Sequence, residues 1–265
     1  MDNHQPIGVF DSGVGGLSVL RHIQETLPFE QLIYVADSAY MPYGSQSPET
    51  IRERSRRITR FFIDAGAKAV VVACNTATAA AIEDLRKEFS VPIIGMEPAV
   101  KPAVESTKSG VIGVLATSGT LSSEKFTRLV QRFDSHAKVV FQPGDGLVEQ
   151  VEAGELDSER TKALLERYVA PLLECGVDTL VLGCTHYPFL APLIRTMVGE
   201  GVSVLDTGNA IAAELKRQLE KLDLIGSSDR FGPVRFFSSG DIERVEPMMS
   251  RLWDGAVQVQ PLNID

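Results

Sequence analysis

The sequence predicts an α/β fold of two pseudo-symmetric domains, each with a mainly parallel sheet flanked by helices, with the active site in the cleft between them. Two observations predict this fold. Apolar runs of strand length alternate with glycine-containing turns and amphipathic helices, a pattern typical of parallel sheets covered on both faces. The same order of elements then begins again near Gly110.

The first half of the chain contains four expected strands with helices between them. Pro48 suits the first turn of one of these helices, and Gly66 suits its end. The strands are expected at Ile7–Phe10, Leu32–Ala36, Ala69–Ala73 and Val91–Met96, and the helices at Leu17–Leu27, Pro48–Ala65 and Thr76–Phe89.

The second half repeats three of these features in the same order. The run Gly110–Leu115 resembles Pro6–Phe10, the strand Thr179–Gly183 ends at a cysteine as Val70–Ala73 does, and Val202–Leu205 resembles Val91–Ile94. We therefore expect one domain from residues 1–98 and 208–265 and a second from residues 99–207. The last expected strands, at 234–237 and 257–259, return to the first domain.

Composition excludes several classes of protein. The chain has 265 residues, of which 44% are hydrophobic and 23% charged, so it can bury an ordinary core. Its net charge of −9 and its lack of lysine or arginine runs argue against a nucleic-acid partner. No apolar run reaches the ~20 residues of a membrane span, and the first residues do not resemble a signal peptide. Three cysteines with no export signal indicate reduced thiols in a cytoplasm.

The residues that carry chemistry are expected in polar turns at the carboxyl ends of strands, where open α/β sheets bind ligands. Cys74 and Cys184 each come directly after an expected strand and directly before an expected helix. Because a helix N-terminus favours the thiolate, both positions predict reactive thiols. Cys175 ends a helical pattern, and we expect it to fill the core.

Other interpretations of the two cysteines are weaker, although cysteine is often only a small buried hydrophobe. No CxxC or HxxxH pair accompanies Cys74 or Cys184, so we expect no metal site. A reducing compartment disfavours a disulfide. Two thiols suit the inversion of a carbon centre, because one base removes a proton from one face and a chemically similar acid returns a proton to the other.

Four motifs together resemble the glutamate racemases of the aspartate/glutamate racemase family. They are FDSGVGG, MPYG, ACNTA and GCTHYP, in that order, and the resemblance extends from Ile7 to about Ala213. The resemblance implies two pseudo-symmetric α/β domains, no cofactor, no pyridoxal phosphate and a supply of D-glutamate for peptidoglycan. We also expect a homodimer, with a small-molecule substrate and no nucleic acid or membrane partner.

The resemblance also assigns roles to individual residues. It makes Cys74 and Cys184 the acid/base groups, for the D- and L-enantiomer respectively, with Asp11 assisting the first thiol and His186 the second. Glu152 matches an acidic position of the family near the second thiol. From sequence alone, Asp11 could instead cap the following helix, His186 could be a packed core histidine, and Glu152 could be a solvated helix charge.

Substrate binding requires hydrogen-bond donors for two carboxylates and acceptors for an ammonium group. Polar turns and their backbone amides supply these groups without any arginine. Thr117, Ser118 and Thr120 form the equivalent turn of the second half, where a simple helix cap is equally consistent. The candidates for substrate contact are Asp11, Ser12, Pro42, Tyr43, Gly44, Asn75, Thr76, Thr117, Thr185 and His186.

Three alternatives stay open at this point. The nearest is a racemase of aspartate or another acidic amino acid in the same family. A non-catalytic amino-acid binding protein would have no need of two matched thiols. A cysteine hydrolase would not exchange the α-proton of an amino acid with solvent, and this separates it from a racemase.

Overall fold

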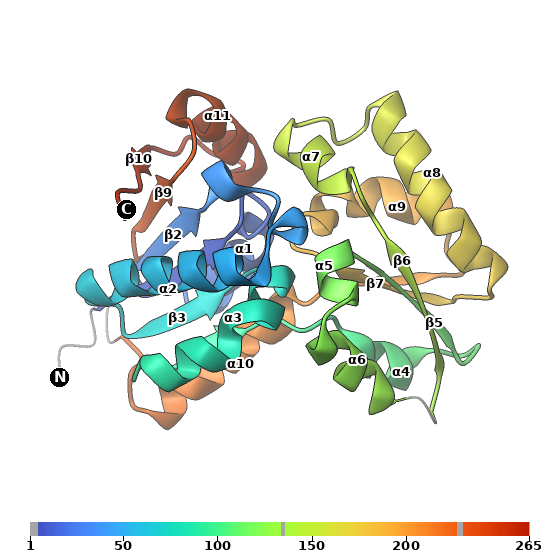
Figure 1. Cartoon of the computed structure of the whole chain (residues 1–265), viewed down its shortest axis with the longest axis horizontal. Helices are drawn as coiled ribbons and strands as arrows, with labels where there is room; N and C mark the ends of the chain where they lie inside the picture. The colour runs from blue at the N-terminus through green and yellow to red at the C-terminus, as the bar shows by residue number, and fades with distance from the viewer. Residues whose placement is uncertain (1–4, 134–135, 227–229, 265) are drawn as a thin grey trace. The chain divides into compact units, whose positions relative to one another are not determined.

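The computed structural model describes residues 5–133, 136–226 and 230–264. Within this part of the chain, residues form two compact units (Figure 1). Unit 1 extends to Met96 and resumes at Gly208, and unit 2 is Glu97–Thr207. Among the described residues, no helix combines the length and apolar character that crossing a membrane requires.

Unit 1 is built on a six-stranded sheet in the order β10-β9-β2-β1-β3-β4, and all its strand pairs are parallel. The central strands are buried along their whole length, as expected for a sheet covered on both faces. The strands are β1 (Ile7–Asp11), β2 (Leu32–Ala36), β3 (Ala69–Val72), β4 (Ile93–Gly95), β9 (Val234–Ser238) and β10 (Val259–Pro261).

The α-helices described in unit 1 form two groups. One group packs over the apolar cluster that contains Phe10 and Val72, and in the other group the first helix along the chain contacts both of the others. The first group is α2 (Pro48–Asp64) and α3 (Asn75–Glu88); the second is α1 (Leu17–Thr26), α10 (Gly208–Lys221) and α11 (Ile242–Trp253). The start of α2 follows from its sequence, because the Ser47 side chain accepts a hydrogen bond from the Thr50 N–H and Pro48 occupies the first turn.

Unit 2 repeats the central topology of unit 1. Its sheet has the order β6-β5-β7-β8, with all pairs parallel, which corresponds strand for strand to β2-β1-β3-β4. The strands are β5 (Val111–Ala116), β6 (Lys138–Pro143), β7 (Thr179–Gly183) and β8 (Ser203–Leu205). The helices are α4 (Val100–Ser106), α5 (Ser118–Leu121), α6 (Glu124–Gln131), α7 (Leu147–Glu152), α8 (Glu159–Glu174) and α9 (Ala191–Val198). The predicted α/β class with two mainly parallel sheets is confirmed.

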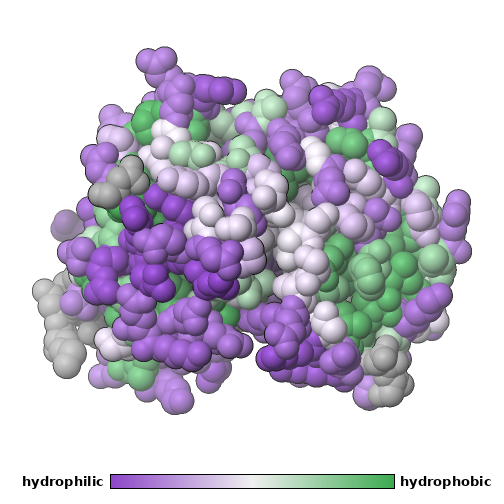
Figure 2. All heavy atoms as spheres, viewed as in Figure 1, coloured by the Kyte–Doolittle hydropathy of each residue, from purple (hydrophilic) through white to green (hydrophobic). Residues whose placement is uncertain are grey.

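Two features of unit 2 were not expected from the sequence. The strand β6 was not predicted; it lies at the edge of its sheet, and Phe141 on it is 56% exposed and packs edge-on against Phe126. Figure 2 shows apolar side chains gathered on this face of unit 2. The prediction that Cys175 fills the core is wrong: it is exposed, because it caps the end of α8, where the chain turns away through Gly176 at a φ of 82°.

Candidate active site

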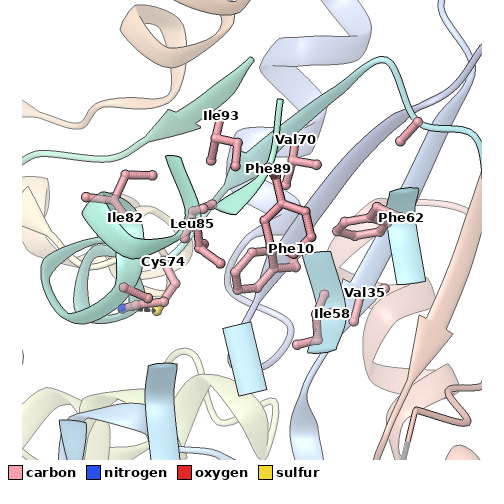
Figure 3. Close-up of a cluster of buried hydrophobic side chains, with 14 of the residues drawn as sticks. Phe10, Val35, Ile58, Phe62, Val70, Cys74, Ile82, Leu85, Phe89 and Ile93 are labelled. Carbon is pink, nitrogen blue, oxygen red and sulfur yellow. Dashed lines mark hydrogen bonds between the residues drawn. The ribbon is translucent and has the colours of Figure 1, made fainter. Parts of the chain in front are cut away.

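Cys74 is fixed by the junction of β3 and α3. It is the N-cap residue of α3, and its Sγ accepts a hydrogen bond from the N–H of Ala77 at 3.4 Å. Figure 3 shows this bond as the dashed line at the sulfur, with Cys74 near Ile82 and Leu85 of the apolar cluster. The side chain is buried. An N–H group and the helix dipole both stabilise negative charge on sulfur, so the site favours a thiolate.

The turn after β1 lies beside this thiol. The Ser12 Oγ is 3.9 Å from the Cys74 Sγ. Asp11 ends β1 and is fully buried, and its Oδ2 accepts a hydrogen bond from the Gly16 N–H at 2.7 Å. The carboxylate therefore binds the turn that leads into α1, whose N-cap residue is Gly16 and not Asp11 as the capping interpretation expected. Its role in proton transfer stays a prediction.

Asn75 has the chemistry of a ligand-binding side chain. It is buried, and neither its amide oxygen nor its amide nitrogen has a hydrogen-bond partner among the described residues. Such a group costs free energy unless a partner binds it. Thr76 beside it is also buried.

Tyr43 brings the MPYG motif into the same unit. Its side chain is buried, and its hydroxyl donates a hydrogen bond to Asp37 Oδ2 at 2.6 Å, while Pro42 and Gly44 are half-buried. Burial and the negative charges of Asp37 and Cys74 raise the pKa of Tyr43 well above its ordinary value, so the phenol stays a neutral donor. Asp37 and its partner Arg54 belong to no motif, so the sequence did not indicate them.

Cys184 lies at the equivalent strand end of unit 2. It is buried directly after β7, with its Sγ 3.7 Å from Nδ1 of His186. The expectation that it directly precedes a helix is wrong. A turn follows it, and then the 3₁₀ helix Tyr187–Leu190 and α9, because Pro188 suits the start of that short helix. Of the two cysteines, only Cys74 therefore lies at a helix N-terminus, where the helix dipole stabilises negative charge on its sulfur.

His186 links this second thiol to a carboxylate. Its Nε2 is 2.7 Å from Oε1 of Glu152, which ends α7; the side chain of His186 is 2% exposed and that of Glu152 is 9% exposed. Burial lowers the pKa of His186, but its hydrogen bonds to Cys184 and Glu152 raise it, and the net result is a pKa well above its ordinary value. The protonated form of His186 is thus favoured at its place between the Cys184 sulfur and the Glu152 carboxyl group. Glu152 is not the solvated helix charge of the alternative interpretation.

The remaining candidates lie in unit 2. Thr185 is buried next to Cys184. Thr117 caps α5, since its Oγ1 accepts a hydrogen bond from the Thr120 N–H at 3.2 Å, and the Ser118 hydroxyl donates to Asp145 Oδ1 at 2.8 Å. The helix-cap interpretation of this turn is observed, and its contact with substrate stays a prediction. Within the described residues, no cluster of three or more His, Cys, Asp or Glu side chains is arranged to hold a metal ion.

Comparison with known proteins shows the family to which the chain belongs. Residues 7–215 match the family model of Asp/Glu/Hydantoin racemases. The chain belongs to this racemase family. A glutamate racemase of Stutzerimonas stutzeri is 54% identical over 249 residues, with 94% of each chain covered. A glutamate racemase of Methylococcus capsulatus is 54% identical over 260 residues, with 98% of this chain and 96% of the relative covered.

Solved structures agree with this membership. A glutamate racemase isoform from Bacillus anthracis has 33% identity and a TM-score of 0.88, with 99% of this chain and 98% of that chain covered. The glutamate racemase of Francisella tularensis, solved with D-glutamate, has 26% identity and a TM-score of 0.87, with 99% of each chain covered. This member of the racemase family is therefore an enzyme, an isomerase that racemises an amino acid.

Proposed function

We propose that this racemase interconverts L- and D-glutamate by a cofactor-independent transfer of the α-proton between two cysteines. The observation that carries the proposal is the pair of thiols at equivalent positions. Cys74 follows β3 and Cys184 follows β7, and these strands occupy the same place in two sheets of the same topology. Relatives that carry the name glutamate racemase at 54% identity support glutamate as the substrate.

In the proposed reaction, one thiolate removes the α-proton from one face of the substrate, and the other thiol donates a proton to the opposite face. The roles exchange in the reverse direction, so the two groups must be chemically alike. The mechanism requires both units to present their thiols to one α-carbon. From the family resemblance, Cys74 serves D-glutamate and Cys184 serves L-glutamate.

Different side chains are proposed to assist proton transfer at each of the two thiols. Asp11 assists Cys74, and the His186–Glu152 pair assists Cys184 by keeping a positive charge beside the sulfur whenever it is a thiolate. The 2.7 Å contact between His186 and Glu152 supports the second assignment. A fixed ion pair of this kind needs no reorganisation as charge develops on the thiol.

Recognition of glutamate is proposed to rest on neutral donors. The buried amide of Asn75, which lacks a partner among the described residues, is the strongest single indication. The other proposed contacts come from Asp11, Ser12, Pro42, Tyr43, Gly44, Thr76, Thr117, Thr185 and His186.

We also propose the wider setting that the resemblance implies. The two compact units are the two domains of a homodimeric cytoplasmic enzyme, and its D-glutamate enters peptidoglycan. Sedimentation equilibrium tests the homodimer, and a mass of about 28.8 kDa for the native protein, the mass of a single chain, would contradict it.

The direct test follows L- and D-glutamate in D₂O with purified protein and no added cofactor. We expect circular dichroism to decay to zero from either enantiomer, with deuterium entering the α-position. Faster racemisation of aspartate than of glutamate would instead support the rival acidic amino-acid racemase. Absence of α-deuteration would contradict any proton-transfer function, as expected of a binding protein or a cysteine hydrolase.

A further inference from the structure

A buried ion pair in unit 1 is hydrogen-bonded to Tyr43, which lies in the Pro42–Gly44 turn. Arg54, in the middle of α2, donates hydrogen bonds to both oxygens of Asp37, from Nη2 to Oδ1 at 2.8 Å and from Nε to Oδ2 at 3.0 Å. The side chains are 5% and 0% exposed. The same Oδ2 accepts the hydroxyl of Tyr43 at 2.6 Å, and the guanidinium lies 4.1 Å from the ring centre of Tyr40.

These hydrogen bonds connect the turn that carries the MPYG motif to α2 and to the end of β2. Asp37 directly follows β2, and its backbone N–H donates to the carbonyl of Asp11 at 3.0 Å, which ties it to the neighbouring strand end. A two-pronged Arg–carboxylate contact restricts direction as well as distance.

The held turn is one of the proposed contacts with substrate. Tyr43 begins the 3₁₀ helix Tyr43–Ser45, and its side chain is buried. The phenol also lies within electrostatic range of the catalytic sulfur, since the charge on Cys74 is one of the causes that raise the pKa of Tyr43.

We propose that Arg54 and Asp37 are positioning residues of the Cys74 half of the active site, which hold Tyr43 and thereby the Pro42–Gly44 turn in the geometry that binds the substrate. The inference rests on the proposed function. Neither residue touches the substrate. Both act through the Tyr43 hydroxyl, so their loss disturbs substrate binding more than it disturbs the chemistry of the thiol.

The same unit contains a matched control. Lys68 and Glu30 form a second buried ion pair, with 2.6 Å between Nζ and Oε2 and side chains that are 1% and 4% exposed. These residues precede β3 and β2, at the amino ends of the strands. Substrate binds at the carboxyl ends in such sheets, so the second pair has a comparable structural role without the positioning role.

The experiment compares Arg54→Met with Lys68→Met, since each leaves a buried carboxylate without its cation. Both variants are expected to lower the melting temperature. Arg54→Met alone should raise KM for both enantiomers of glutamate by about tenfold or more, because loss of a hydrogen bond to a charged group costs roughly that factor in binding. Its kcat should stay within about threefold of the wild-type value, since ground-state binding is what changes.

Two further variants make the comparison decisive. Tyr43→Phe keeps the ion pair and the packing but removes the connecting hydroxyl, so it should raise KM without a comparable loss of melting temperature. Arg54→Lys restores the charge but not the two-pronged contact, and should recover only part of the KM. If Arg54→Met does not fold, Tyr43→Phe carries the test.

An active wild-type enzyme whose KM for glutamate is unchanged in Tyr43→Phe and in any folded Arg54→Met would overturn the inference. Equal KM changes in Arg54→Met and Lys68→Met would also overturn it, because the effect would then be structural. A wild-type chain that does not racemise glutamate would overturn the proposed function and the inference together, and so is distinguishable from the other two results.

Discussion

Cys74 and Cys184 lie in different electrostatic surroundings. Cys74 accepts a hydrogen bond from a backbone N–H at 3.4 Å and donates one to the Ser12 hydroxyl at 3.9 Å, and both of these partners are neutral. Cys184 has an imidazole that is itself paired with a carboxylate. A thiolate at Cys184 is therefore stabilised by a charge that can be titrated. At Cys74 the N–H group and the helix dipole keep their effect at any pH.

The His186–Glu152 pair predicts a pH-dependent stability. Because folding raises the pKa of His186, its protonation stabilises the folded state. This contribution is present in full below the ordinary histidine pKa of about 6.5 and is lost as pH rises through the raised pKa. Glu152→Gln removes one cause of the raised pKa. Urea unfolding should therefore show a larger loss of stability for this variant at pH 6 than at pH 9.

The same variant should lower kcat by about 10²-fold, the usual scale for an assisting acid/base group. Glu149→Gln is the control, since Glu149 is an exposed carboxylate on the same helix α7. It should change neither stability nor rate. An equal loss of stability at both pH values would show that Glu152 does not control the protonation of His186.

Cys175 offers a test of which thiols matter. It is exposed at the end of α8, whereas Cys74 and Cys184 are buried. Cys175→Ala should keep wild-type turnover and lie within about 0.5 kcal/mol of the wild-type free energy of unfolding, as surface changes usually do. Alkylation of one remaining thiol should then abolish racemisation. A folded Cys175→Ala enzyme that loses ~10³-fold in rate would contradict the assignment of the reactive thiols.

Individual elements differ in how far sequence predicts them. The strands β2 and β7 match the expected bounds, because buried runs between glycine or polar turns have a distinct pattern. The edge strand β6 lacks such a run, since none of its residues is buried. The segment after Cys184 was misassigned because a single strand–cysteine–helix pattern was assumed for both halves. Distance along the chain also concealed Arg54, which lies 17 residues from Asp37.

The turn between β1 and α1 depends on the absence of one side chain. A Cβ on Gly16 would lie 2.7 Å from the Asp11 Cβ and 2.9 Å from the Tyr34 hydroxyl, both closer than packing permits. Gly16→Ala should therefore lower the free energy of unfolding by about 1–3 kcal/mol, the usual cost of overpacking. It should also raise KM, since Asp11 and Ser12 would shift.

Gly255→Ala is the control for this turn. It lies in the same unit, and an added Cβ would meet only a Trp253 atom at an ordinary 3.9 Å. Chemical unfolding and steady-state kinetics of the two variants give the comparison. Equal stability of Gly16→Ala and wild type would show that the turn adapts without strain.

At the scale of the whole molecule, the repeated topology is the feature that sequence predicted best. The order of motifs indicated two similar α/β halves, and the sheets β2-β1-β3-β4 and β6-β5-β7-β8 have the same connectivity. The resemblance of four motifs to a racemase family agrees with the family match over residues 7–215. Contacts between side chains distant in sequence, such as Arg54 with Asp37, needed the structure.

The proposed chemistry uses only groups of the protein itself. Racemisation should therefore survive exhaustive dialysis against a chelator and treatment with a carbonyl-trapping reagent, with the rate unchanged. The control is a pyridoxal-phosphate racemase treated in parallel, which should lose activity. Loss of activity in this enzyme, with recovery on adding back a metal or pyridoxal phosphate, would contradict the cofactor-independent mechanism.

Variants that keep only one of the two thiols test whether each thiol serves one face of the substrate. Cys74→Ser and Cys184→Ser should each racemise glutamate extremely slowly, because a serine hydroxyl is far less acidic than a thiol, whose ordinary pKa is about 8.5, and so supplies neither the acid nor the ionised base. Each should still eliminate chloride from 3-chloroglutamate. The remaining thiolate takes the α-proton, the α–β double bond forms, chloride leaves, and no proton is needed on the far face.

The measurement is the rate of chloride release from each enantiomer of 3-chloroglutamate by each variant. We predict opposite preferences. Cys184→Ser, which keeps Cys74, should act on the D-enantiomer, and Cys74→Ser should act on the L-enantiomer. Opposite preferences with the two cysteines exchanged would correct only the assignment of faces. The same preference in both variants would contradict the mechanism of one thiol on each face.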